Sequence, residues 1–372
     1  MTETGRLSEG EFEARRGATR RLLGELSLDA LVAFSSYQER DGHVAYLTNH
    51  RIALPDVQSH LGLGHAAFVL PVDGKTTLVS PLGCCRETLS GVDEVKTGPD
   101  LVEELTAAVR RSGLEGSSIG IAGTDVLPAE YFLRFEAALV GATVRPADDL
   151  LESQRMVKSA AEVALLRRAA HVADAGLRAA LETTHQGVSE REIELAVRRE
   201  VAALDADSVP RVRIASGKTI RSSSWPAVGA RRLQDGDLVR VDLAGWYGGY
   251  AFSGSRVTCV GKPSVEQRRC LDHAAEATEW MTTALRTDSP VRFVYTESRG
   301  RSIIPFGHGI GLEACERPWL TMGAEVALRP SMVLCIGPTL VAPGLGDVSI
   351  ADMVLVTKTG VEVLSESPRV VW

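Results

Sequence analysis

The hydrophobic pattern of the chain changes once, near residue 150, and this change restricts the fold more than any other feature. Before it, short apolar runs of strand length alternate with amphipathic helical stretches, as they do in α/β domains. The strand-like runs are residues 31–34, 66–71, 76–80 and 118–122, and the helical stretches are 15–28, 101–111 and 129–139. We therefore expect the first 150 residues to form an α/β domain.

After the change, the chain opens with two long helical patterns. Ser159 with Glu162, and Ser189 with Glu192, have the spacing of capping boxes, which begin helices by satisfying free backbone N–H groups. Further strand-like runs lie at 238–244, 256–260, 332–336 and 353–357, with a helical stretch at 265–285. A length of 372 residues suits two domains. Residues 151–372 are predicted to form an α+β domain, with helices grouped against a sheet.

Charge and composition exclude several classes of protein. Lys plus Arg number 41 and Asp plus Glu 48, so the net charge of −7 provides no positive field for nucleic acid. No run of eighteen apolar residues exists, which argues against a membrane-spanning protein. The polar start lacks the order of a secretory signal, and we expect a cytoplasmic protein. The six cysteines show no C-x-x-C spacing, and we predict no disulfides.

Two glycine-rich segments contain the side chains that can carry chemistry. Residues 241–256, VDLAGWYGGYAFSGSR, have the pattern of a strand, a turn and a second strand. Residues 305–318, PFGHGIGLEACERP, place His308 between two glycines, where backbone can approach a ligand closely.

These segments resemble the motifs of the creatinase, prolidase, aminopeptidase P and methionine aminopeptidase family, which has the pita-bread fold. The stretches DLAGWYGGYAFSGSR, GHGIGLEACERP, MVLCIGPTL and IADMVLVT follow the family's motifs in order and with matching local spacing. The helix RMVKSAAEVALLRRAA is similar to the one that opens the family's catalytic domain. The resemblance implies a creatinase-like α/β domain over residues 1–150 and a pita-bread α+β domain over residues 151–372.

The resemblance also shows where the chain departs from the family's metallopeptidases, which bind two divalent metals through Asp, Asp, His, Glu and Glu. Asp242 and His308 keep two of these positions, whereas Ser253, Gly337 and Ala351 replace the other three. Two ligands are too few for a dinuclear site. We therefore expect no metal, no other cofactor and no metallopeptidase activity.

Asp242, His308 and Glu316 are the predicted catalytic residues. An imidazole titrates near neutral pH without help, and Asp242 is expected to orient it. Glu316 is either a second general acid or base, or the partner of Arg256 or Arg317 in a salt bridge.

Cys315 replaces a histidine of the family motif. Beside His308 its thiol is a candidate nucleophile, although buried cysteines are more often inert. One zinc ion held by Asp242, His308 and Cys315 is a further alternative.

The predicted substrate-binding residues are Trp225, Ser253, Arg256, Cys315, Arg51 and His50. Loss of carboxylates and gain of an indole indicate a larger, less cationic ligand, unless Trp225 fills the emptied cavity as core. The base of creatinase would fall on Trp225 or Ser224, so creatine hydrolysis is not expected. In creatinase-like dimers one amino-terminal domain closes the site of the other subunit. The resemblance thus implies a homodimer in which Arg51 and His50 meet a ligand carboxylate.

These observations lead to three hypotheses about function. The first is a metal-independent hydrolase, lyase or isomerase-like enzyme, biosynthetic in role, that acts on a small molecule by general acid–base chemistry through C–N hydrolysis, elimination or rearrangement. The second is an inactive pseudo-peptidase that binds a peptide or protein partner. The third is a metallopeptidase whose ligands are misassigned. We predict the first.

Overall fold

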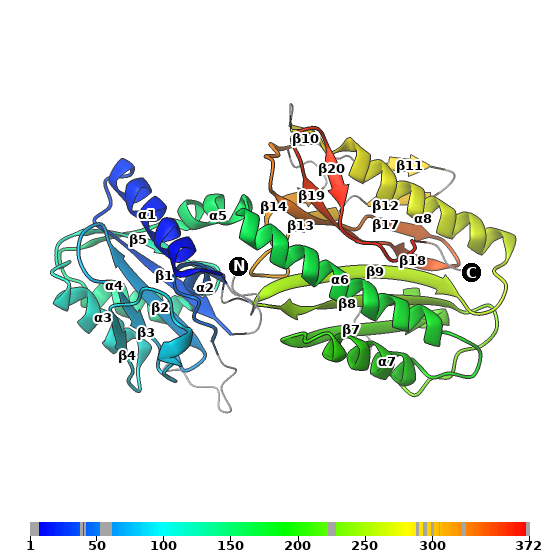
Figure 1. The fold of residues 1–372 in the computed structure, drawn as a ribbon, viewed down its shortest axis with the longest axis horizontal. Coiled ribbons are helices and arrows are strands. Elements are labelled where there is room, and N and C mark those ends of the chain that lie inside the picture. The colour runs from blue at the N-terminus through cyan, green and yellow to red at the C-terminus, as the bar shows by residue number, and fades with distance from the viewer. Residues whose placement is uncertain are drawn as a thin grey trace. The chain divides into compact units, whose positions relative to one another are not determined.

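A computed structural model describes residues 7–37, 40, 42–52, 62–221, 228–287, 290–292, 296–298, 301–304, 306–321 and 325–369. The chain divides into two compact units, Met1–Arg155 and Met156–Trp372, and Figure 1 shows their elements. The division falls within helix α5 (Asp148–Met156), close to the change of pattern in the sequence.

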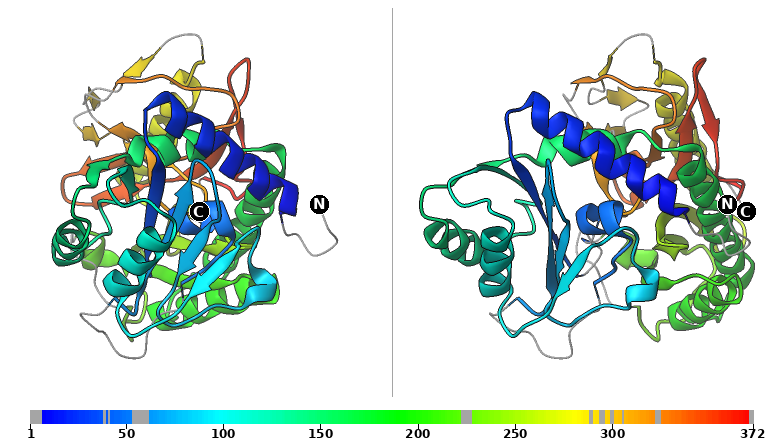
Figure 2. Two further views of the ribbon diagram at one scale, coloured as in Figure 1. Left: turned by 90° about the vertical axis from the view of Figure 1, so that its left-hand side faces the viewer. Right: turned by 60° about the vertical axis from the view of Figure 1, so that its left-hand side comes forward.

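The first unit is built on one six-stranded sheet with strand order β4-β3-β2-β1-β5-β6. The strands are β1 (Ala30–Ser36), β2 (His65–Pro71), β3 (Thr77–Val79), β4 (Glu94–Lys96), β5 (Ser118–Ala122) and β6 (Thr143–Pro146). The helices are α1 (Glu9–Glu25), α2 (Gly42–Thr48), the 3₁₀ turn η1 (Arg86–Thr88), α3 (Leu101–Arg111) and α4 (Ala129–Ala138). Figure 2 shows α3 and α4 on one face of the sheet and α1 and α2 on the other. The predicted α/β domain is confirmed.

The second unit begins with two helices, α6 (Ala160–Thr183) and α7 (Glu190–Ala203), and both predicted capping boxes are formed. These helices pack on an antiparallel sheet of β7 (Ser208–Ser216), β8 (Leu238–Tyr247) and β9 (Tyr250–Cys259) (Figure 1). The close approach of Gly176 on α6 to Leu243 shows which face of the sheet the helices cover. Because side chains alternate along a strand, Arg240 and Asp242 lie on the opposite face.

The rest of the second unit consists of short strands around helix α8 (Val265–Ala284). A five-stranded sheet has the order β14-β13-β16-β19-β20, and a four-stranded sheet the order β11-β12-β17-β18. These strands are β11 (Thr296–Ser298), β12 (Arg301–Ile304), β13 (Phe306–Gly309), β14 (Glu316–Thr321), β16 (Val333–Ile336), β17 (Thr339–Ala342), β18 (Gly346–Ser349), β19 (Asp352–Val356) and β20 (Val361–Val363). The remaining elements are the 3₁₀ turn η2 (Gly217–Arg221) and the paired strands β10 (Val291–Arg292) and β15 (Glu325–Val326). An isolated bridge between Ser255 and Ala351 joins β9 to the beginning of β19.

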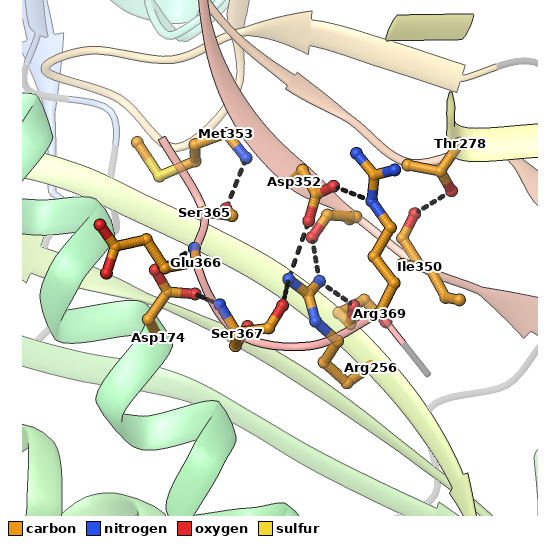
Figure 3. A network of polar contacts seen from close by, with 12 residues as sticks. Asp174, Arg256, Thr278, Ile350, Asp352, Met353, Ser365, Glu366, Ser367 and Arg369 are labelled. Atoms are coloured by element: carbon orange, nitrogen blue, oxygen red, sulfur yellow. Dashed lines mark hydrogen bonds and ion pairs between the residues drawn. The ribbon is translucent and has the colours of Figure 1, made fainter. Parts of the chain in front are cut away.

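A buried network of polar contacts fixes residues 365–369 to the rest of this unit (Figure 3). Arg256 donates to Asp352 at 2.8 Å and to the Ser367 carbonyl at 2.9 Å, and its side chain is 1% exposed. Asp174 on α6 accepts from the backbone N–H groups of Glu366 and Ser367, at 2.6 and 2.9 Å. The predicted substrate-binding role of Arg256 is therefore corrected, since its guanidinium is enclosed by structural partners.

Within the described residues, no helix combines the length and apolar character needed to cross a membrane.

Candidate active site

The β8–β9 hairpin gathers polar side chains on the face that the helices leave uncovered. Its turn is Gly248–Gly249, with φ of 57° and 77°, values that favour glycine. In the register of the hairpin, Asp242 lies opposite Ser255, and Ala244 lies opposite Ser253. Directly opposed residues point to the same side of a sheet. Asp242, Ser253 and Ser255 therefore share one face.

Asp242 is held by its neighbours on the same sheet. Its Oδ1 accepts from Ser255 Oγ at 2.7 Å, and its Oδ2 accepts from Arg240 Nε and Nη2 at 2.9 and 2.8 Å. Among the described residues, Asp242 hydrogen-bonds Arg240 and Ser255, whereas the ring of His308 contacts the Gly309 carbonyl and Cys315, so the expectation that Asp242 orients His308 is corrected. Side chains two residues apart on a strand lie on the same face, so Arg240 is placed beside Asp242 and binds it.

Two further arginines belong to this face. Arg213 lies opposite Asp242 on the neighbouring strand β7, and Arg211 lies opposite Ala244. Burial lowers the pKa of Arg213 to about 10; Arg211 and Arg240 add to this effect, and Asp242 opposes it. The sequence analysis missed these arginines, although Arg-x-Arg at 211–213 and Arg-x-Asp at 240–242 were visible as period-two patterns.

His308 lies on β13, opposite Cys335 on one side and Trp319 on the other, and is 5% exposed. Its Nδ1 is 2.9 Å from the Gly309 carbonyl oxygen, which can only accept, so we assign the ring proton to Nδ1. Burial lowers the pKa of His308, which favours the neutral ring. Its Nε2 is then an acceptor and lies 3.6 Å from the Sγ of Cys315, an exposed residue. The structure therefore brings His308 and the exposed Cys315 together, as the candidate nucleophile beside His308 requires.

Glu316 forms a buried ion pair with Lys158, at 2.5 Å between Oε1 and Nζ. The two side chains are 8% and 1% exposed. Glu316 also lies against Gly311, where a Cβ atom would overlap its carboxylate. Glu316 was predicted either as a general acid or base or as the partner of Arg256 or Arg317 in a salt bridge. Its ion pair with Lys158 favours a structural role. No short-range pattern could reveal a partner 158 residues away.

The remaining positions of the family's metal site are occupied by small or neutral groups. Ser253 hydrogen-bonds Cys335, and burial raises the pKa of the Cys335 thiol to about 12. A Cβ atom built on Gly337 would lie 2.8 Å from the Cβ of Ala351, so these two residues close together.

The residues present do not fit the two metal ions that the family resemblance implies. Among the described residues, no group of three or more His, Cys, Asp and Glu is placed to hold a metal ion. Asp242 is engaged by Arg240, and the space between Gly337 and Ala351 is closed.

Several predicted residues belong to the first unit or lie outside the described structure. His50 and Arg51 belong to the first unit, directly after α2, where the backbone N–H of His50 donates to Thr48 Oγ1 at 3.0 Å. Their role at a dimer interface stays a prediction. Trp225 and Ser224 lie outside the described residues.

An α/β unit followed by an α+β unit, with an aspartate on a glycine-turned hairpin and a buried histidine between glycines, defines the two-domain pita-bread class. The chain belongs to metallopeptidase family M24, whose model matches residues 164–358. The model of the creatinase/prolidase N-terminal domain matches residues 15–157. The predicted family and fold class are thereby confirmed.

Known relatives carry the names of peptidases. The probable dipeptidase PepE of Mycobacterium tuberculosis is 30% identical over 266 residues, which cover 69% of this chain and 70% of that protein. The Xaa-Pro dipeptidase of Pyrococcus furiosus is 33% identical over 233 residues, covering 60% and 66%. Among solved structures, the prolidase of Pyrococcus horikoshii OT3 has a TM-score of 0.78 at 23% identity, covering 96% of this chain and 99% of that one, which shows the shared fold.

These relatives correct the predicted function. A metal-independent small-molecule enzyme using general acid–base chemistry has no counterpart among them, since the relatives are named as dipeptidases and the matching family is one of metallopeptidases. That prediction is wrong. The peptidase names of the relatives also argue against the alternative of an inactive pseudo-peptidase. The error arose because three substituted positions were taken to imply a different reaction. The comparisons support an enzyme of the hydrolase class.

Proposed function

We propose that the protein is a hydrolase of short peptides whose substrate lies against the face of the β7–β8–β9 sheet that carries Asp242. The observation that carries this proposal is the match of the M24 model across residues 164–358, a range that includes the whole polar face and His308. Dipeptides are the substrates that the names of PepE and of the Xaa-Pro dipeptidases imply for those relatives.

The charges of the face suit such a substrate. Arg240 binds the carboxylate of Asp242, Arg213 lies opposite Asp242 on the neighbouring strand, and Arg211 lies on the same face opposite Ala244. A dipeptide carries a carboxylate close to its only peptide bond, and guanidinium groups bind carboxylates through paired hydrogen bonds. The neutral His308 holds an acceptor nitrogen that can take a proton. We expect a homodimer in the cytoplasm as the setting, and light scattering would measure its mass.

The test is hydrolysis of a dipeptide panel by the full-length protein. Ala-Pro, Met-Pro, Ala-Ala and Gly-Gly would be incubated with added Mn²⁺ and, separately, with EDTA, and free amino acids quantified by mass spectrometry. We expect release of amino acids from at least one dipeptide and loss of that release in His308→Ala. Absence of cleavage of every dipeptide under both conditions would reject the proposal.

A further inference from the structure

The strongest unexplained feature of the molecule is the position of Arg240. Its guanidinium forms a fork with Asp242, the residue that the family resemblance assigns to metal binding: Nε lies 3.1 and 2.9 Å from Oδ1 and Oδ2, and Nη2 lies 2.8 Å from Oδ2. Ser255 occupies the other side of Oδ1 at 2.7 Å. Both oxygens of Asp242 are thus already bound by donors.

A divalent cation would need those same oxygens. Protein carboxylates hold such ions at about 2.0–2.6 Å, and the ion also requires several further oxygen ligands. A guanidinium fixed at hydrogen-bond distance would repel the ion as a like charge. Gly337 and Ala351, which by the resemblance stand at the positions of the family's two glutamate ligands, supply no side-chain oxygen. The negative charge of Asp242 is instead balanced by the guanidinium of Arg240.

Arg240 also keeps donors for a ligand. A guanidinium has five N–H groups. In the described structure, the Asp242 carboxylate accepts from the N–H of Nε and from one N–H of Nη2. The Asp347 carbonyl oxygen lies 3.5 Å from Nη1. One N–H group on each of Nη1 and Nη2 is left, and the side chains of Arg240 and Asp242 are 23% and 20% exposed. A planar oxyanion is the ligand group that such a pair of donors matches.

We propose that the guanidinium of Arg240 takes the cation position beside Asp242 and binds the carboxylate of the substrate there. The first half of this inference stands on the geometry alone. The second half, which names the carboxylate, rests on the proposed function. Arg240 thereby becomes a specificity-determining residue of the site, which the sequence analysis did not include.

The first half is tested by calorimetric titration of Mn²⁺ into chelator-treated full-length protein. Wild type, Arg240→Met, Arg240→Lys and Asp242→Asn would be compared with Arg199→Met, which removes an exposed arginine of α7. We expect no saturable Mn²⁺ binding that depends on Asp242. One or two Mn²⁺ ions per wild-type chain, lost in Asp242→Asn, would overturn the inference. Binding that Asp242→Asn retains would support it, because Asp242 is then no ligand.

The second half is tested with L-proline and L-prolinamide, two probes that differ only in the carboxylate and contain no bond for a dipeptidase to cleave. We expect Arg240→Met to raise the Kd for L-proline at least about tenfold and to leave that for L-prolinamide unchanged, with Arg240→Lys between wild type and Arg240→Met. Equal losses for both probes, or no binding of L-proline by the wild type, would overturn the carboxylate assignment.

The two proposals fail separately. A protein that binds L-proline through Arg240 but cleaves no dipeptide would refute the peptidase function and keep the inference. Dipeptide cleavage that Arg240→Met leaves unchanged would support the peptidase function and refute the role of Arg240 in binding the substrate carboxylate. Circular dichroism and a melting curve of each variant would establish that it is folded. If Arg240→Met is not folded, Arg240→Lys replaces it in both tests.

Discussion

Arg256 on β9 shows how a buried charged residue contributes to the stability of the second unit. Its guanidinium binds Asp352 and the carbonyls of Ser255, Ala351 and Ser367, at 2.8–2.9 Å. Both charged side chains are 1% exposed, so neither can regain water without opening the unit. Removing one member of such a pair leaves the other as a buried charge.

We expect Arg256→Met to lower the free energy of unfolding by about 3–5 kcal/mol, because Asp352 would keep only Arg369 as a charged partner. The matched control is Arg167→Met, which breaks an exposed pair with Glu362 and should cost no more than about 1 kcal/mol. Urea unfolding measures both. Similar losses in the two variants would contradict the assignment of Arg256.

His43 predicts a dependence of stability on pH. It is 5% exposed in α2, with Nδ1 at 3.2 Å from Arg155 Nη1. Burial first, then the charges of Arg155 and Arg40, hold the pKa of His43 well below its ordinary value. Below about pH 6.5, His43 therefore binds a proton in the unfolded chain but stays neutral in the folded chain. The free energy of unfolding should fall as the pH drops from 7.5 to 5.5.

The measurement is urea unfolding of wild type, His43→Gln and His171→Gln at both pH values. His43→Gln should show a smaller fall than wild type, with the remainder due in part to His65 and His308, whose pKa values are also lowered by burial. His171 is exposed, so His171→Gln should behave as wild type does. An unchanged fall in His43→Gln would count against this explanation.

At the level of elements, the sequence predicted what local interactions determine. Helix α3 has the predicted bounds, and both capping boxes form, because their signals lie within three or four residues. Strand β7 was missed because Pro210 and two arginines interrupt its apolar pattern. The same limit applies to the site. Motifs identified Asp242 and His308, whereas the pairing of Lys158 with Glu316 depends on packing between distant elements.

Strand β13 depends on a glycine next to the catalytic candidate. The register of β13 and β14 shifts between His308 and Gly309, and a Cβ atom on Gly309 would overlap the backbone carbonyl of Arg317. Backbone cannot move aside as a flexible side chain can.

We expect Gly309→Ala to destabilise the protein by about 3 kcal/mol and to displace His308, since overpacking a close contact forces the backbone to shift. The control is Gly24→Ala in α1, where a Cβ atom would meet nothing within 4 Å; there the change should stabilise by about 0.5–1 kcal/mol. Melting curves compare the two variants. A fully stable Gly309→Ala protein would contradict the packing described here.

At the scale of the whole molecule, each unit has its own apolar core. In the first unit α3 and α4 pack on the sheet, with Phe135 fully buried and its ring 6.4 Å from that of Phe34. In the second, α8 packs on the two sheets of short strands. All five tryptophans follow residue 156, so their fluorescence reports on the second unit alone.

This distribution predicts separate unfolding of the two units. Phe135→Ala should destabilise the first unit by about 3–5 kcal/mol and shift part of the circular dichroism transition, while the fluorescence midpoint stays within error of wild type. Met281→Ala, in the core of the second unit, should move the fluorescence midpoint instead. Equal shifts of both signals in either variant would show that the units unfold as one.

Glu366 and Ser367 are hydrogen-bonded to Asp174 on α6 and to Arg256 on β9, and proteolytic removal of these residues would break the contacts. Loss of the residues after Leu364 would remove the two N–H groups that donate to Asp174 and the carbonyl that Arg256 contacts. Two buried charges would lose partners although the active-site face itself stayed intact. A carboxypeptidase that passes Ser367 would therefore weaken the packing of α6 and β9 without cutting either element.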